Sequence, residues 1–95
     1  MEERIFIVVT KDNFKEVDKF TGNNFSSYGY REDVIGNIFE LSNDLPEEVE
    51  FAKKHSKYIL TEEQAKNSNK QFIYTYGYPE TRLILYNWEE YQKNW

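Results

Sequence analysis

The hydrophobic and polar positions of this chain follow two periods, and they predict strands and helices in turn. Arg4–Thr10 is a β-branched apolar run with the length of a strand that is buried on both faces. Apolar residues then recur at helical spacing, so we expect a helix over Lys11–Phe20, with Thr10 or Asp12 as its cap. The polar composition of 21–27 predicts a loop.

The segment 28–42 fits two interpretations. We favour a β-hairpin closed by Gly36 and Asn37, because glycine at the first turn position suits a type II′ turn. The alternative is one helix, since residues at helical spacing would form an apolar stripe of Val34, Ile38, Leu41 and Leu45. Glycine and asparagine inside that helix would cost about 1 kcal/mol or more, which counts against it.

The middle of the chain carries clear helix signals. Pro46 and the acids after it predict the start of a helix that runs to about His55. The apolar residues 58–60 form either a short strand or a continuation of that helix. Thr61 and Gln64 match a capping box, so a second short helix begins there.

Residues 71–88 (QFIYTYGYPETRLILYNW) predict an aromatic hairpin, followed by a polar and aromatic tail over 89–95. Alternate residues of a strand share one face, and here they form a row of Phe72, Tyr74, Tyr76 and Tyr78. We interpret most of this row as core. A domain of this size cannot cover every ring, however, and exposed tyrosines are typical of protein recognition.

The loop length decides which residues lie on the face of this row. A four-residue loop aligns the row with Leu83 and Leu85, whereas a three-residue loop aligns it with Ile84 and Tyr86. The shorter loop needs Thr81 in a left-handed conformation, which β-branched residues avoid. We therefore expect the four-residue loop.

The element order, β-α-ββ-α-(β)-α-ββ, predicts an α+β fold. We expect residues 1–95 to form one small domain, a mainly antiparallel sheet with two or three short helices packed on it. The chain has no cysteine, no apolar run long enough to span a membrane and no signal-peptide pattern. We therefore expect a cytoplasmic protein without membrane contact.

The net charge is −5 with a pI near 4.9, and the basic residues are dispersed. Direct binding of duplex nucleic acid is therefore not expected, because phosphate neutralisation needs a basic patch. His55 is the single histidine, with Glu48 and Glu50 near it on the same predicted helix. We interpret it as a helix C-terminal residue. No catalytic motif occurs, so we expect neither enzyme activity nor a metal or other cofactor.

Acidity, size and surplus aromatics together suggest a binding protein. We expect an inhibitor encoded by a phage or mobile element, or an immunity-type partner, that blocks a basic site on a nucleic-acid-handling or effector protein. The predicted binding residues are Tyr76, Tyr78, Glu80, Tyr86, Glu89, Glu90 and Trp95. The same hairpin also suits a homodimer interface. The alternative is a nucleotide or small-ligand sensor with an aromatic pocket lined by Arg31 or Arg82.

Overall fold

The computed structural model describes residues 4–21, 24–76 and 82–93, with only the backbone of Asn24 and Tyr76. The strands are β1 (Ile5–Val8), β2 (Ile38–Leu41), β3 (Ile59–Leu60), β4 (Phe72–Tyr76) and β5 (Arg82–Tyr86). The helices are α1 (Phe14–Phe20), α2 (Asn24–Ser27), α3 (Arg31–Val34), α4 (Pro46–Lys54), α5 (Glu62–Lys66) and α6 (Trp88–Lys93), with a 3₁₀ turn, η1 (Ser56–Tyr58).

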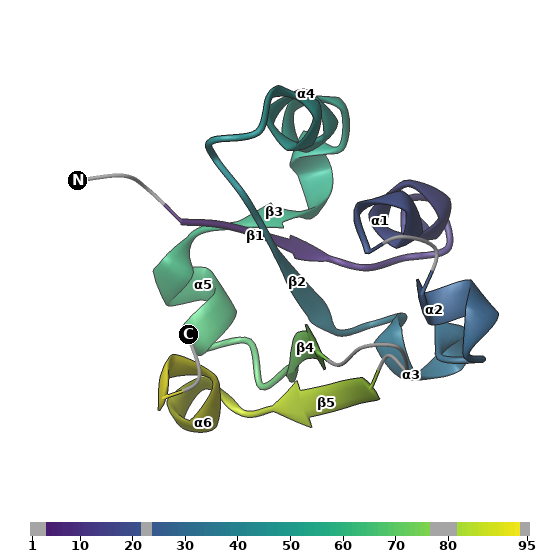
Figure 1. Cartoon of the computed structure of the whole chain (residues 1–95). Helices are drawn as coiled ribbons and strands as arrows, with labels where there is room; N and C mark the ends of the chain where they lie inside the picture. The colour runs from purple at the N-terminus through teal and green to yellow at the C-terminus, as the bar shows by residue number, and fades with distance from the viewer. Residues whose placement is uncertain (1–3, 22–23, 77–81, 94–95) are drawn as a thin grey trace.

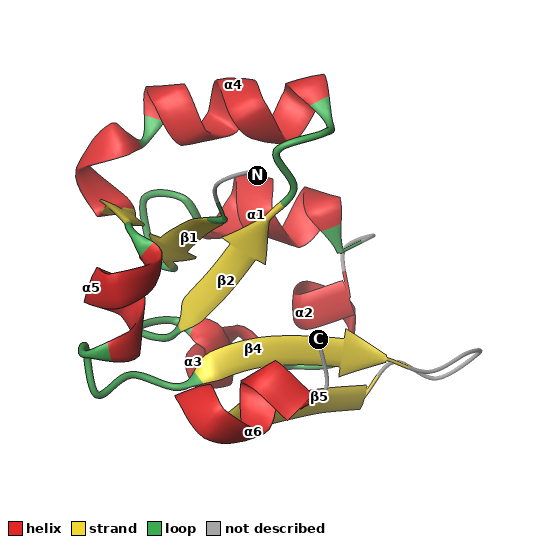
Figure 2. Ribbon diagram, turned by 90° about the vertical axis from the view of Figure 1, so that its left-hand side faces the viewer, coloured by secondary structure: helices red, strands yellow, loops and turns green. Residues whose placement is uncertain are grey.

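The predicted α+β class is confirmed. One five-stranded sheet has the order β3-β1-β2-β4-β5, and its neighbours are antiparallel except for the parallel pair β2 and β4. In Figure 1, α4 lies at the top of the molecule and α6 at the bottom, with the strands between them. Figure 2 shows the same arrangement from the side. Within the described residues, no helix has the length and apolarity needed to cross a bilayer.

Strand β1 separates two cores, as the apolar run at Arg4–Thr10 predicts. Phe6 and Ile7 are neighbours that point to opposite faces, and both are fully buried. On the face with α1 to α4, the buried residues are Ile7, Val9, Phe14, Val17, Phe25, Val34, Leu41, Phe51 and Ile73. On the face with α5 and α6, they are Phe6, Ile38, Ala65, Phe72 and Tyr91. We call these the large and the small cluster.

The predicted caps of α1 are wrong, because the helix begins later, at Phe14. The buried side chain of Asn13 accepts the amide of Thr10 at 2.9 Å and donates to the carbonyl of Val8 at 3.0 Å. The Thr10 hydroxyl accepts the amide of Asp12 at 3.2 Å. These three side-chain bonds close the turn between β1 and α1.

The loop predicted over 21–27 is also wrong in part, since it contains the short helix α2. Asp18 explains how this helix is held. Its buried carboxylate accepts the backbone amides of Phe25, at 2.9 Å, and Ser26, at 3.3 Å. This carboxylate therefore fixes α2 against α1, and the ring of Phe25 fills the large cluster.

The hairpin predicted over 28–42 is wrong, and so is the alternative of one continuous helix. The segment forms α3 before Gly36 and β2 after it, so each interpretation is right on one side only. The helix ends at Val34 because the backbone of Ile35 is extended, and Gly36 follows with a left-handed φ of +92°. Its amide donates to the Val9 carbonyl at 2.8 Å, and the Val9 amide donates to the Asn37 carbonyl at 2.9 Å. The turn thus extends the pairing of β1 with β2.

The helix signals of the middle segment are confirmed. Helix α4 begins at Pro46 and has His55 at its C-cap. Residues Ile59–Leu60 form a strand, not a continuation of the helix. The capping box is present: the amide of Gln64 donates to the Thr61 hydroxyl at 3.1 Å, and the Thr61 amide donates to the Gln64 side chain at 2.9 Å.

The register of the aromatic hairpin contradicts the four-residue loop. Tyr74 lies opposite Ile84 and Tyr76 opposite Arg82, so an odd number of residues separates paired positions. The face that turns to the large cluster therefore carries Ile73, Leu83 and Leu85. The aromatic row therefore shares its face with Ile84 and Tyr86, the pairing given above as the alternative.

The segment predicted as a tail forms a helix over most of its length. In α6, Tyr91 is buried and its ring stacks on Phe72 with centroids 5.1 Å apart. Trp88 packs against the same ring at 5.2 Å. These contacts place α6 on the face of the sheet that carries the aromatic row.

Candidate functional site

The structure describes part of the predicted binding set. Tyr86, Glu89 and Glu90 are described in full, and Tyr76 has a described backbone at the end of β4. Tyr78, Glu80 and Trp95 lie outside the described residues. Tyr86, Glu89 and Glu90 lie at the junction between β5 and α6, whereas Tyr76 lies opposite Arg82 at the other end of the hairpin.

The aromatic part of this junction is half-buried. Tyr86 packs against the small cluster, and its ring centroid lies 5.9 Å from that of Tyr74. Tyr74 and its neighbour Ile84 are also only partly exposed. These side chains continue the aromatic row from Phe72, the ring against which α6 packs. The row is therefore core at the α6 end and reaches the surface further along the hairpin.

The acidic part is the first turn of α6, where Glu89 and Glu90 are exposed. Asn87 caps this turn, because its side chain accepts the Glu90 amide at 2.9 Å and its carbonyl accepts the Tyr91 amide at 2.9 Å. Among the described residues, the Glu89 carboxylate has no hydrogen bond or ion pair. We use the name junction surface for Tyr74, Ile84, Tyr86, Glu89 and Glu90, which lie on β4, on β5 and in the first turn of α6.

A polar network fixes α6, and hence the junction surface, to the sheet. Arg4 binds Glu40 at two points, with Nε to Oε2 and Nη2 to Oε1 both at 2.8 Å. The Tyr91 hydroxyl donates to the same Oε1 at 2.7 Å. The side chains of Arg4 and Glu40 are only 14% and 11% exposed. Charge-assisted bonds of this geometry are strong and directional.

Further contacts surround the guanidinium of Arg4. Its Nη1 donates to Glu62 at 3.1 Å and to Gln92 at 3.0 Å, which ties α5 and α6 to β1. Its carbon lies 5.0 Å from the ring of Phe6 and 5.5 Å from that of Trp88, distances that suit cation–π attraction. Arg4 thus joins the ends of several elements around one charge.

The network shifts two pKa values. The hydrogen bonds and charge of Glu40 raise the pKa of Arg4, against the effect of its burial. Burial, together with the hydrogen bond to Glu40, raises the pKa of the Tyr91 phenol well above its usual 10. Both shifts hold the network in the state with a charged guanidinium and a neutral phenol.

Sequence reasoning missed this network entirely. Glu40 lies 36 positions from Arg4 and 51 from Tyr91, and none of the three belongs to a motif. The available signal was an isolated acid on the predicted strand after Asn37, at a position between apolar residues. Such an acid is expensive to bury alone, so it implies a basic partner.

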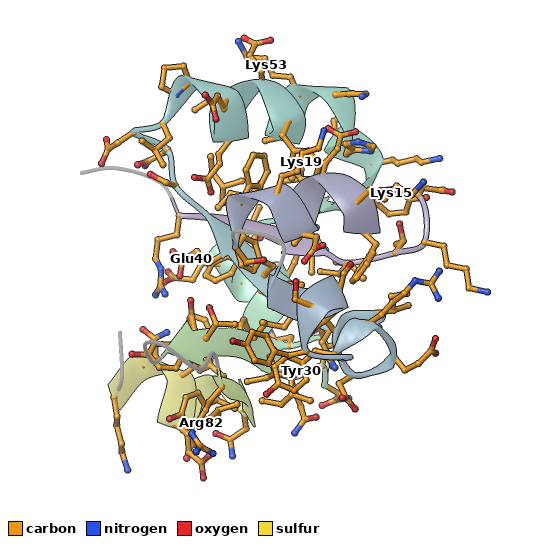
Figure 3. All side chains as sticks on the ribbon, turned by 45° about the vertical axis from the view of Figure 1, so that its right-hand side comes forward. Lys15, Lys19, Tyr30, Glu40, Lys53 and Arg82 are labelled. Carbon is orange, nitrogen blue, oxygen red and sulfur yellow. The ribbon has the colours of Figure 1, made fainter. Side chains whose placement is uncertain are left out.

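A groove of about 500 Å³ lies between α1 and α4. The side chains that line it are Glu16, Lys19, Phe20, Glu47, Glu50, Phe51 and Lys54. Two of these rings, Phe20 and Phe51, meet edge to face at 5.1 Å. Figure 3 shows Lys15, Lys19 and Lys53 in the upper part of the view and Arg82 near its lower end.

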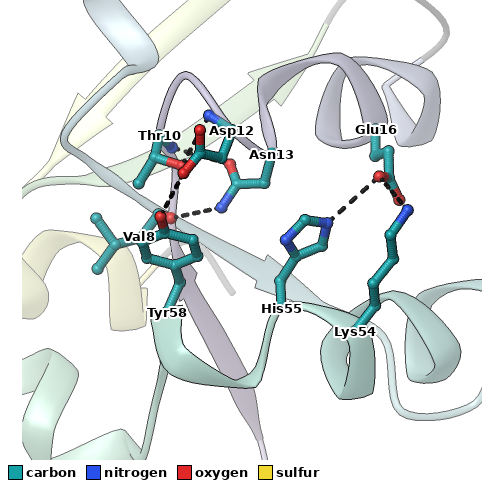
Figure 4. A network of polar contacts seen from close by, with 8 residues as sticks. All are labelled: Val8, Thr10, Asp12, Asn13, Glu16, Lys54, His55 and Tyr58. Atoms are coloured by element: carbon teal, nitrogen blue, oxygen red, sulfur yellow. Dashed lines mark hydrogen bonds and ion pairs between the residues drawn. The ribbon is translucent and has the colours of Figure 1, made fainter.

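His55 lies beside the groove, and its carboxylate partner is not the predicted one. Its Nε2 lies 3.3 Å from Glu16 on α1, which also accepts a bond from Lys54 at 2.9 Å (Figure 4). The hydrogen bond from Lys54 is the main cause that lowers the pKa of Glu16, and His55 adds to it. Glu48 on the same helix instead accepts the amide of Ser42 at 3.1 Å.

The surroundings of His55 indicate a structural role. Its ring lies 4.8 Å from that of Phe51 and 6.5 Å from that of Tyr58, and the Tyr58 hydroxyl donates to Asp12 at 2.7 Å. These bonds connect the end of α4 to the start of α1, as Figure 4 shows. Within the described residues, no group of three or more His, Asp or Glu side chains is arranged to hold a metal ion.

The groove does not have the lining expected for the nucleotide-binding alternative. Neither Arg31 nor Arg82 contributes to it, and carboxylates form much of its wall. Arg31 lies over the ring of Phe14 at 5.5 Å and pairs with Glu32 at 3.2 Å. The alternative therefore stays a prediction without support from this groove.

Comparisons with protein-family models, with curated proteins and with solved structures find no match to this chain.

Proposed function

We propose that this protein acts by binding another protein through the junction surface, which occupies a basic site on the partner. The observation that carries the proposal is the junction itself. The half-buried ring of Tyr86 is followed three residues later by the exposed carboxylate of Glu89. Aromatic rings provide contact area at low entropic cost, and carboxylates pair with Lys or Arg.

The rigid support of α6 favours this use. The Arg4–Glu40–Tyr91 network and the stacking of Tyr91 on Phe72 hold the helix before any partner arrives. A surface that is already ordered loses less conformational entropy on binding. The charge of −5 also favours encounter with a basic partner, by an attraction that salt weakens.

In biological terms, we propose an inhibitor or immunity-type protein of a phage or mobile element, active in the cytoplasm. Its target would be a nucleic-acid-handling or effector protein with a basic working surface. The Tyr rings would enter pockets on that surface, while Glu89 and Glu90 pair with its cations. Blocking the basic site would stop the target from reaching its own anionic ligand.

The test is affinity capture with the tagged protein from lysate of its host cell, at low salt and at about 0.5 M salt, where charges are strongly screened. We expect one basic protein to be retained at low salt and lost at high salt. The variant Glu89→Lys should lose that partner at low salt as well. Capture of no protein at either salt, or retention that Glu89→Lys leaves unchanged, would contradict the proposal.

A further inference from the structure

Strand β5 forms an edge of the sheet that nothing in the described structure covers. It pairs with β4 alone, and among the described residues no backbone hydrogen bond forms on its other side. Helix α6 does not provide this cover. It packs on the face of the hairpin, through the contact of Tyr91 with Phe72.

The two edges of the sheet differ in a way that matters for assembly. The opposite edge is β3, which has two residues, and short edge strands resist pairing with other chains. Strand β5 has five residues and reads Arg-Leu-Ile-Leu-Tyr. Natural edges are commonly protected by proline, by an inward-pointing lysine or by a bulge, and the interior of β5 has no proline or charge. Strand β5 therefore lacks these protections.

The sequence of β5 identifies a second copy of itself as the best partner strand. An antiparallel pair centred on Ile84 places Leu83 opposite the partner's Leu85 and Ile84 opposite the partner's Ile84. The ends then match as well, because each Arg82 lies opposite a tyrosine, the partner's Tyr86, and not opposite another arginine. Any shifted register pairs fewer residues and loses this match.

We infer that two copies of the chain associate through antiparallel pairing of their β5 edges, with the two-fold axis at Ile84. The two sheets then become one continuous sheet, joined by about four to six backbone hydrogen bonds. The inference rests on the backbone edge of β5 and not on the carboxylates of α6, although Ile84 and Tyr86 also belong to the junction surface. Self-association of the purified chain is measured without any partner, so its failure and the failure of the proposed function are distinguishable. A dimer would carry two junction surfaces, one for each copy.

The test measures mass by sedimentation equilibrium over protein concentrations from low micromolar to near-millimolar. The wild-type chain should shift from monomer to dimer. Ile84→Lys and Ile84→Glu each place like charges at the two-fold axis, and should weaken self-association about tenfold or more. Gln71→Lys is the matched control, since it changes the charge of the protein equally at an exposed site before β4.

A mixture separates lost pairing from lost folding. Ile84→Lys and Ile84→Glu at equal concentrations should form a heterodimer more tightly than either forms a homodimer, because opposite charges then meet. Hydrogen exchange on the wild-type chain adds a measurement without mutation: amides of 82–86 should exchange more slowly at high concentration, and those of 59–60 should not. A wild-type chain that stays monomeric at every concentration overturns the inference, as does a dimer that Ile84→Lys leaves unchanged.

Discussion

Arg4 and Glu40 meet at two points, with both N–O distances at 2.8 Å, although 36 positions separate them in the chain. This pair connects β1 to β2 and receives the hydroxyl of Tyr91 from α6. It explains why a short helix at the end of the chain keeps a fixed place on the sheet. The stability of the fold and the order of the junction surface therefore depend on the same charges.

Glu40→Gln should destabilise the protein strongly. The substitution leaves the guanidinium of Arg4 largely buried without its main counter-charge, a loss of about 3 kcal/mol. In a domain of this size, that lowers Tm by roughly 10–20 °C in a thermal unfolding experiment. Glu62→Gln is the control, because Glu62 contacts the same guanidinium from a 54% exposed position and should cost less than about 1 kcal/mol. Equal losses in the two variants would mean that burial of the pair has no part in its strength.

Tyr91→Phe should reduce stability by about 1 kcal/mol at neutral pH, the usual net value of one hydrogen bond. Its effect on alkaline unfolding is more specific. The folded state holds the Tyr91 proton more tightly than the unfolded state, whose pKa is near 10. Above about pH 10 the unfolded state gains from ionisation, so wild-type stability falls by up to about 1.4 kcal/mol per pH unit from this group.

The measurement is a series of urea unfolding curves from pH 8 to about pH 11, a range that spans the usual pKa of an unfolded tyrosine. The stability difference between wild type and Tyr91→Phe should shrink as the pH rises. A difference that stays constant over the whole range would show that Tyr91 ionises equally in both states.

Glu16→Gln should make the free energy of unfolding depend less on pH in the acidic range. Lys54 and His55 lower the pKa of Glu16 below its usual value of 4.5, so its carboxylate stabilises the fold at higher pH. That contribution is lost as the pH falls below about 4.5 and through the lower folded-state pKa. Because Glu16 is one-third exposed, the effect should stay within about 1 kcal/mol. Glu50→Gln is the control, since Glu50 is 76% exposed and lies 3.7 Å from Lys53. If both variants changed the pH dependence of stability equally, the contacts of Glu16 with Lys54 and His55 would not be the cause of that pH dependence.

Gly36→Ala should cost about 1–2 kcal/mol, the penalty of a left-handed backbone for a residue with a Cβ atom. No atom beyond the neighbouring residues Ile35 and Asn37 lies within 4 Å of the position that the Cβ would take, so the cost comes from the local backbone. Gly36→Asn should lose less, because asparagine tolerates this conformation. Chemical unfolding measures both. An alanine variant as stable as wild type would show that the backbone conformation at residue 36 does not strain a residue with a Cβ atom.

Local signals in the sequence predicted much of the fold. Pro46 began a helix and Thr61 capped another, because caps and breakers act on their immediate neighbours. The pattern also predicted that β1 is buried on both sides. The segment around Gly36 was harder, since a glycine between two apolar runs can close a hairpin or end a helix. The choice depended on Val9, which pairs with the backbone of this turn from a distant part of the chain.

The hairpin register and the polar network could not be read from local pattern. The observed register packs Leu83 and Leu85 against the large cluster. The strain of a short turn predicted the other register, because it takes no account of this packing. Glu40 and Tyr91 meet only after the sheet has formed. Glu89 and Glu90 are exposed, but the helix that carries them depends on the contact of Tyr91 with Phe72.

The central claim is that the junction surface binds a basic partner, and one comparison tests it most directly. Glu89→Lys and Glu63→Lys each reverse one exposed acid in the first turn of a short helix, so they change the net charge equally. With the captured partner, we expect Glu89→Lys to weaken binding by roughly tenfold or more at low salt, and Glu63→Lys to change it by less than about threefold. The difference should shrink as salt is added. Equal effects of the two variants would contradict the claim, because net charge alone would then explain the binding.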